Sequence, residues 1–582
     1  MNRPATSNRR RQQGALTVIT PLLLLIVVIL SVMALDGARL YMLRGEMQAQ
    51  VNVAAQAAAA EAQSCGGQFV STAVIQSRAL AAAQAQGFSE EDGSLQVQVG
   101  LIEDADGSNV LSFRPVNFVE ESNAVLVTYT RSEPISLLLP ESTFGTLDMS
   151  VNAAARREVI ATLSAGGSTA TVGPGILGGL LGAVLGDPGF VLDPTSLDSL
   201  RNTTVEVGDL LTELGVATLA DALDLDGGRL AGALSNIAGS ASPLGNILDD
   251  LLTANGIGTI KVSDVLEVVE GTQVPTDSEF PLYDMVISLV LNVAETQQSD
   301  TAGFLGIPLD LNINLAPLAS IETDLDLHVG AAPKIVVGPA RQDADGEWRT
   351  RFYAPDISLL VTAKVDVLSA GPVGGVANIT LPLAVNAGGA HGDFVSADCA
   401  LGSSNEVEIG VRLERSVALL ASGTIDPGTG VINRQPVTVR LLNIIPVLLP
   451  SLDVDVSVEG EVPGVTSQVV VTPDYPLYCD AVTGCEQHSY EDLGGGVAGL
   501  NLDVEVEKAA LGGLDLGGLL NPILNFLNLL LRDVVEAVAA QLINPLLQTL
   551  GLGLGGASVT VTNASQGNSQ LIENIEIAAP GQ

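Results

Sequence analysis

The chain has 582 residues, enough for several domains that each bury a core, and only 3% are aromatic, so aliphatic side chains must build those cores. The formal net charge at pH 7 is −41. Residues 1–14 hold four arginines and no acidic residue, which leaves 21 basic against 66 acidic side chains, a charge of −45, in the rest of the chain. A body this acidic repels phosphate backbones, so the composition argues against nucleic-acid binding.

An uncharged run of 21 residues, Ala15–Leu35, follows this basic tail. As a helix it is roughly 31 Å long, which matches the hydrocarbon core of a bilayer. Four arginines precede the run, whereas Arg39 and Arg44 follow it, so the positive-inside rule predicts a cytoplasmic N-terminus and an exported body. We therefore expect residues 15–35 to contact the lipid bilayer as a transmembrane helix.

A cleaved signal peptide is the alternative, because Val32-Met33-Ala34 has the small residues of a cleavage site. Two features favour a retained anchor. The uncharged run is longer than the usual apolar region of a signal peptide, and residues 36–64 continue with the helix formers Ala, Gln, Leu and Glu. The sequence therefore predicts one continuous helix of about 50 residues.

The N-terminal residues also carry a family pattern. A basic tail ends at Gly14, the apolar run follows, and Asp36-Gly37-Ala38-Arg39-Leu40-Tyr41 leads into an Ala- and Gln-rich continuation. This segment resembles the TadE/TadG-like proteins of the Flp (tight adherence) pilus machinery. In the pseudopilin members a prepilin peptidase cuts after the glycine, so the resemblance implies a processing site between Gly14 and Ala15. Those members have Glu at the fifth mature position, where this chain has Ile19, which favours the larger, uncleaved TadG-like branch.

Asp36, Gly37, Arg39 and Tyr41 are the family motif that follows the anchor, and small residues near them would let another membrane helix approach closely.

Beyond the anchor, hydrophobic periodicity predicts an α+β body with antiparallel sheets and helical subdomains outside the membrane. A helix over 68–86 ends at Gly87, and alternating runs at 95–99, 124–130 and 149–155 predict a small sheet packed on it. The predicted organisation is a cytoplasmic tail (1–14), a transmembrane helix (15–35), a periplasmic helix extension (36–64), a small α+β domain (65–162), a helical region (163–300), a β-rich domain (301–470) and a region with a Cys-containing loop, amphipathic helices and terminal strands (471–582).

The helical region contains an internal repeat. Val205–Leu211 recurs 55 residues later as Ile260–Leu266, and each copy places an aspartate, Asp209 or Asp264, where we expect it to cap a helix N-terminus. Near the C-terminus, Asn521-Pro522 and Asn544-Pro545 are predicted helix starts. The apolar stripe between them is expected to pack on its own domain, with a partner helix or the membrane surface as the alternative.

Four cysteines lie beyond the anchor, in a compartment where disulfides persist if the body is exported. Cys479 and Cys485 enclose a turn-like stretch and are the predicted pair. A bridge between Cys65 and Cys399 is a further candidate, although spacing cannot fix connectivity. A metal site formed by Cys479, Cys485 and His488 is a third reading, but its spacing matches no common zinc pattern.

Other motifs are weak. Gly173–Gly178 matches GxGxxG, yet the glycines after it oppose the helix that a nucleotide needs, so a linker is expected. Three D-x-D-G sequences begin at Asp104, Asp224 and Asp343; none has the order of an EF-hand loop, which favours turns over calcium sites. The sequence contains no GxSxG, HExxH or P-loop motif, so we predict no enzyme, cofactor, metal or small-molecule substrate.

Together, the anchor and the resemblance imply a non-catalytic, single-pass protein of the bacterial inner membrane with a periplasmic or extracellular body. It is expected to act in Flp-type pilus assembly, or a related surface apparatus, through its anchor helix and through contacts with other pilus assembly proteins. A calcium-stabilised surface adhesin or binding module is the alternative, and an exported hydrolase is the third. Cleavage at Gly14, disulfide connectivity, calcium binding, partner identity and oligomeric state stay open.

Overall fold

A computed structural model gives the fold of two compact units, residues 1–158 with 568–582, and residues 159–567. The structure describes residues 13–103, 111–138, 140–165, 174–239, 242–272, 274–298, 303–308, 312–315, 319–367, 376–399, 407–414, 418–445, 449–462, 466–471, 487–489, 503–509, 517–550, 552–553, 556–566 and 569–577. The predicted mixture of helices and antiparallel sheets is confirmed.

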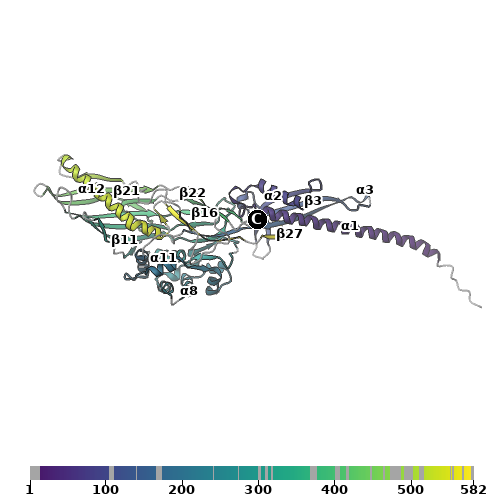
Figure 1. Ribbon diagram of the computed structural model, residues 1–582, viewed down its shortest axis with the longest axis horizontal. Coiled ribbons are helices and arrows are strands. Elements are labelled where there is room, and N and C mark those ends of the chain that lie inside the picture. The colour runs from purple at the N-terminus through teal and green to yellow at the C-terminus, as the bar shows by residue number, and fades with distance from the viewer. Residues whose placement is uncertain are drawn as a thin grey trace, which may run out of the picture. The chain divides into compact units, whose positions relative to one another are not determined.

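The first unit is built on α1 (Gln13–Ala59), so the predicted continuous helix is confirmed. The second helix, α2 (Thr72–Ala85), lies beside it (Figure 1). The Ser71 side chain accepts from the Val74 N–H at its start, and Gly87, with φ of +91°, reverses the chain after its end. Shorter helical turns are η1 (Gly67–Phe69), η2 (Val119–Glu121) and α3 (Glu141–Phe144).

The sheet of the first unit has the order β2-β1-β3-β4-β27 and is antiparallel. Its strands are β1 (Ser94–Glu103), β2 (Ser112–Pro115), β3 (Ala124–Pro134), β4 (Thr146–Arg156) and β27 (Gln570–Glu573). The three alternating runs read from the sequence are β1, β3 and β4, as predicted. The fifth strand comes from the C-terminal part of the chain, where Ile572 pairs with Ala154 of β4.

Alternation along these strands separates two buried layers. On one face, Val125, Val127, Ala153 and Ala155 pack against α1 and α2. On the other face, a smaller cluster consists of Ile102, Phe113, Ala124, Leu126, Ala154 and Ile575. The sheet is therefore apolar on both sides, and its C-terminal residues help to cover the face away from α1.

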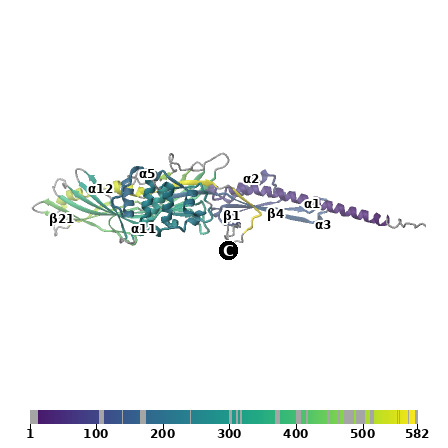
Figure 2. The same ribbon diagram turned by 90° about the horizontal axis from the view of Figure 1, so that it is seen from below.

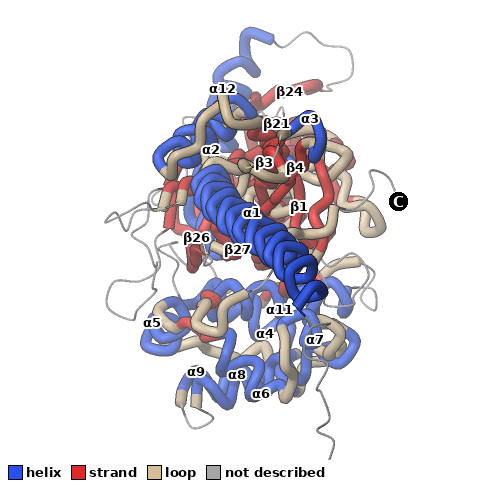
Figure 3. The backbone as a smooth tube through the Cα atoms, turned by 90° about the vertical axis from the view of Figure 1, so that its right-hand side faces the viewer, coloured by secondary structure: helices blue, strands red, loops and turns tan. Residues whose placement is uncertain are grey.

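The second unit contains a group of helices that includes α11 (Leu282–Gln298), most of whose side chains are buried (Figures 2 and 3). The other helices of this part of the chain are α4 (Pro174–Leu185), α5 (Pro194–Arg201), α6 (Val207–Leu214), α7 (Leu219–Ala222), α8 (Gly227–Ala238), α9 (Pro243–Leu252), η3 (Ile257–Thr259) and α10 (Val262–Val265).

Two local predictions in this region were wrong. The expected linker after Gly173 is α4, whose glycines permit close packing: a Cβ on Gly182 would lie 2.7 Å from the Asp187 carbonyl oxygen. Asp209 and Asp264 do not occupy the N-cap position, because the helices begin two residues earlier, at Val207 and Val262, and each aspartate is the third helical residue. From there the Asp264 carboxylate accepts from the Lys261 N–H at 2.9 Å, the reverse half of a capping box.

Sheets form the rest of the second unit. The largest, antiparallel throughout its described pairs, contains β9 (Leu305–Ile307), β10 (Asn312–Leu315), β11 (Ala319–Ala331), β14 (Asp356–Val367), β15 (Val376–Ala387), β18 (Ala418–Ile425), β19 (Ile432–Arg434), β20 (Val437–Ile445), β21 (Leu449–Val462) and β24 (Asp503–Ala509). A second contains β5 (Val159–Ala165), β7 (Leu266–Val268), β12 (Ile335–Pro339), β23 (Gln487–Ser489), β25 (Leu552–Gly553) and β26 (Gly556–Gln566). A third contains β13 (Arg351–Tyr353), β16 (His391–Asp398), β17 (Glu408–Glu414) and β22 (Thr466–Val471), and β6 (Thr204–Glu206) pairs with β8 (Glu279–Pro281).

The C-terminal helices run without a break. The start predicted at Asn521-Pro522 was wrong, whereas a helix segment does begin at Asn544, with Pro545 in its first turn. Helix α12 (Gly517–Val538) already includes Pro522, and a π-helical segment, Ala539–Ile543, connects it to α13 (Asn544–Thr549). A wider π turn accommodates Pro545, which lacks the N–H that an α-helix would use there. Leu527, Leu531, Val534 and Val538 are buried, so this part of the stripe packs on its own chain, as expected.

Candidate functional site

The N-terminal half of α1 packs against no other described element. Every side chain from Ile19 to Ser31 is exposed, and the most apolar window has a mean hydropathy of 2.6 with none of it buried. Because these leucines, isoleucines and valines contact no other described part of the chain, they are not the core of a soluble domain. By length and composition this is the one described helix able to cross a membrane. Pro21 lies inside it, as membrane helices tolerate.

The same helix becomes a core element farther along. Burial starts at Val32 and Asp36, which are half-buried, and is complete at Met47, Val51 and Ala54. These positions recur every three or four residues, so one stripe of the helix faces the sheet. Anchor and body are therefore joined by uninterrupted helix rather than by a linker.

A substitution in this stripe tests the packing. Ala58 is 0% exposed in the layer between α1 and the sheet, and Ala58→Leu should lower the free energy of unfolding of the first unit by about 1–3 kcal/mol, because three extra carbons have no space there. Thermal unfolding in detergent, followed by circular dichroism, measures the loss. Ala57→Leu, one residue away and half-exposed, is the control. Equal effects of the two changes would contradict this packing.

Two residues of the family motif fasten α1 to the hairpin between β3 and β4. The Arg39 Nη2 donates to the Pro134 carbonyl oxygen at 2.6 Å and lies 3.6 Å from the Glu133 carboxylate. The Asp36 Oδ1 accepts from the Leu137 N–H at 3.4 Å. Both contacts lie just past the end of the uncharged run, where the anchor meets the body. The sequence did not reveal them, because Asp36 and Leu137 are 101 residues apart.

The other two motif residues lie on the open face of the helix. A Cβ added to Gly37 would meet nothing within 4 Å, and Tyr41 is 81% exposed. Ala34, Ala38 and Gly45 are also exposed, and their spacing places them on the same face. Gly14 and Ala15 are in the first turns of α1, which leaves the predicted processing untested.

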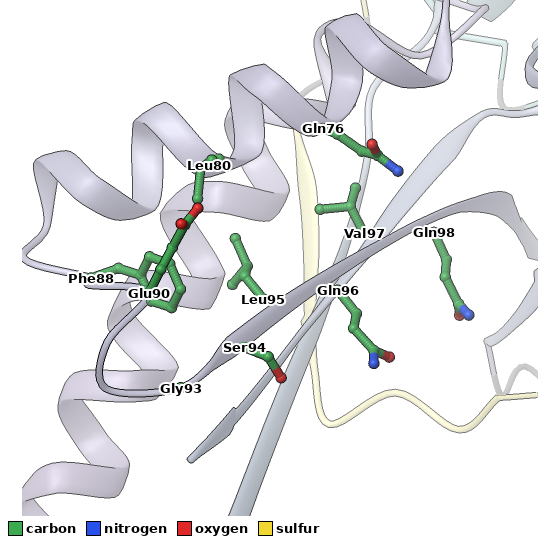
Figure 4. A pocket seen from close by; sticks show the side chains of 10 residues that line it. All are labelled: Gln76, Leu80, Phe88, Glu90, Gly93, Ser94, Leu95, Gln96, Val97 and Gln98. Atoms are coloured by element: carbon green, nitrogen blue, oxygen red, sulfur yellow. The ribbon is translucent and has the colours of Figure 1, made fainter.

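A hollow of about 700 Å³ lies between α2 and β1 in the same unit (Figure 4). Leu95 and Val97 point toward α2, whereas Gln96 and Gln98 point away. Because β2 pairs only with Gly100–Glu103, no described strand pairs with the outer edge of β1 along this hollow. An edge of this kind can accept an extended segment as an added strand. The lining residues are Gln76, Leu80, Phe88, Glu90, Gly93, Ser94, Leu95, Gln96, Val97 and Gln98.

Two of the cysteines are described. Cys65 and Cys399 are buried, and each is in a disulfide bond. The predicted pair Cys479 and Cys485 lies outside the described residues and stays a prediction.

The D-x-D-G sequences that are described form caps and turns. The Asp226 Oδ1 accepts from the Arg229 N–H at 2.9 Å at the start of α8, and the Asp343 Oδ1 accepts from the Asp345 N–H at 2.9 Å in a turn closed by Gly346, with φ of +84°. The sequence beginning at Asp104 lies outside the described residues. Within the described ranges, no three His, Cys, Asp or Glu side chains gather as metal ligands would.

A buried ionic cluster in the second unit was also missed. Asp393, whose side chain is 0% exposed, accepts from the Arg351 Nε at 2.6 Å and from the Arg412 Nη2 at 2.7 Å. The hydrogen bond to this carboxylate raises the pKa of Arg351 above its usual value. Each residue is on a different strand, β13, β16 or β17, so the cluster joins three strands.

No family model, curated protein or solved structure matches the chain.

Proposed function

We propose that this chain is a non-catalytic, membrane-anchored component of a Flp/Tad-type pilus assembly or a related surface apparatus. The membrane anchor rests on the single helix α1, exposed from Ile19 to Ser31 and buried in the first unit from Met47 onward. The pilus assignment rests on the resemblance of the segment from Gly14 to Tyr41 to TadE/TadG-like proteins. At 47 residues α1 is roughly 70 Å long. A continuous helix of this kind connects the bilayer and the body rigidly, so it can transmit force that a flexible linker would not.

The proposed orientation has the N-terminus in the cytoplasm and the body beyond the inner membrane. Four arginines and no acidic residue precede the anchor, which supports this direction by the positive-inside rule. The disulfide bonds of Cys65 and Cys399 support it independently, because disulfides persist outside the reducing cytoplasm.

The proposed partners are other pilus assembly proteins, bound laterally to the anchor helix. Ala34, Gly37, Ala38 and Gly45 are exposed on one face, and small residues let a second helix approach closely enough for dispersion contacts. This face is opposite the stripe that packs on the sheet, so a partner helix can reach it while the first unit stays folded.

Crosslinking in living cells tests the lateral contact. With a photoreactive residue at Tyr41, Gly37→Leu should reduce the crosslinked product several-fold, because the leucine keeps the partner helix at a distance. The substitution should not disturb the fold of this chain, because a Cβ at position 37 meets nothing within 4 Å and leucine is a better helix former than glycine.

The control is Glu46→Leu, which places a leucine at an exposed position of the same helix outside the small-residue face. Equal product from Gly37→Leu, Glu46→Leu and wild type would contradict lateral packing. Mass spectrometry of the product identifies the partner, and the absence of any pilus assembly protein among the products would contradict the pilus assignment.

A further inference from the structure

The turn that joins β3 and β4 is unusually apolar for a loop. We define the hairpin tip as residues 135–138 and 140–147. Leu137 and Leu138 are 66% and 69% exposed, and Phe144 is 47% exposed. Ile135 and Leu147 are also exposed. An exposed group of large apolar side chains at one tip marks a contact surface rather than chance exposure.

The tip is held at a defined level of α1, beside the helix (Figure 2). Arg39 bonds the Pro134 carbonyl oxygen where β3 ends, and Asp36 bonds the Leu137 N–H within the tip. Val32, the last half-buried position toward the N-terminus, lies one helical turn before Asp36. The tip therefore reaches the end of the uncharged run Ala15–Leu35.

The rise of the helix gives the depth at which the hairpin tip lies in the bilayer. When residues 15–35 span the hydrocarbon core, Asp36 to Arg39 occupy the next ~6 Å of the helix. The headgroup layer on each side of the core is roughly 5–7 Å thick. The two side chains that hold the tip therefore lie in that layer, and the exposed leucines lie at its level.

The backbone of the tip is suited to such a place. The Ile135 N–H donates to the Gly145 carbonyl oxygen at 3.2 Å, and within the turn of α3 the Phe144 and Gly145 N–H groups donate to Pro140 and Glu141 at 3.2 and 2.7 Å. Because these backbone groups are already hydrogen-bonded to one another, moving them out of water costs little free energy. The tip has no basic residue and one acidic residue, Glu141, so attraction to anionic headgroups does not explain the surface.

We propose that the hairpin tip inserts Leu137, Leu138 and Phe144 into the interfacial layer of the bilayer that α1 spans. The inference rests on the proposed membrane anchor. It gives the protein a second contact with the lipid, which limits the rotation of α1, together with the first unit packed on it, about the helix axis and so fixes which face of the helix is presented to partners.

Depth-dependent fluorescence quenching tests the insertion in the full-length protein. The chain has one tryptophan, so Trp348→Phe gives a tryptophan-free background. Into it, Leu138→Trp reports on the tip, Leu30→Trp on the anchor, and Phe69→Trp on an 88% exposed site near the other end of α1. Each variant is reconstituted in phosphatidylcholine vesicles with bromine near the headgroup or deep in the acyl chains.

We expect shallow bromine to quench the tryptophan at 138 more than deep bromine, deep bromine to quench the one at 30, and neither to quench the one at 69. Quenching at 30 without quenching at 138 would overturn the inference and leave the anchor standing; the tip would then be a surface for a protein partner. No quenching at 30 would overturn the anchor and the inference together. Equal quenching at 69 and 138 would also overturn it.

Discussion

Replacing Leu24 and Val28 with arginine should release the protein from the membrane. Both side chains are more than half exposed on the bare part of α1, near the middle of the uncharged run. An arginine at the centre of a membrane helix costs about 2.5–3.5 kcal/mol on insertion scales, so the pair costs about 5–7 kcal/mol. That is more than a thousandfold in the equilibrium between inserted and uninserted chains. Carbonate extraction followed by membrane fractionation measures the shift.

The matched control carries two arginines farther along the same helix. Met42 and Ala49 are exposed but lie past Asp36, so Met42→Arg with Ala49→Arg should leave the protein in the membrane fraction. If Leu24→Arg with Val28→Arg stays as membrane-bound as this control, α1 is not the anchor. A phosphatase that is active only outside the cytoplasm, fused after Gln582 of the unaltered chain, reports the orientation, and a fusion that is made but inactive would contradict export.

The elements with strong local patterns could be predicted from the sequence. The helix α1 follows from its charge-free run and helix-forming continuation, and β1, β3 and β4 follow from period-two alternation. Helix α4 was missed because its glycines were weighed by propensity alone, whereas packing against the segment that follows offsets their cost. Tertiary contact therefore outweighed the local preference.

Contacts between distant residues could not be predicted. The bond between Asp36 and Leu137 depends on how the hairpin folds back on α1, and β27 reaches β4 only after the whole second unit has intervened. The apolar run at the hairpin tip was a readable signal, since a turn between two strands is usually polar. The sequence did not show where this run lies relative to the membrane, because only the contact between the hairpin tip and α1 gives that position.

The buried ionic cluster yields the second large effect. Arg351→Leu should destabilise the second unit by about 1.5–3 kcal/mol, because it removes one of the two charged hydrogen bonds to the buried Asp393 carboxylate and leaves Arg412 as its remaining partner. Arg351 and Arg412 are themselves partly exposed, which keeps the loss below that of a fully buried pair. Denaturation by urea, followed by the signal of Trp348, measures the change.

A surface pair provides the comparison. Arg434 pairs with Glu459, and both side chains are about half exposed, so Arg434→Leu should move the urea midpoint little. Replacing Arg351, Asp393 and Arg412 together with leucine should restore much of the loss, because no buried charge then lacks a partner. If Arg351→Leu costs no more than Arg434→Leu, Arg412 alone satisfies Asp393. The cluster would then set which strands pair rather than how strongly they hold.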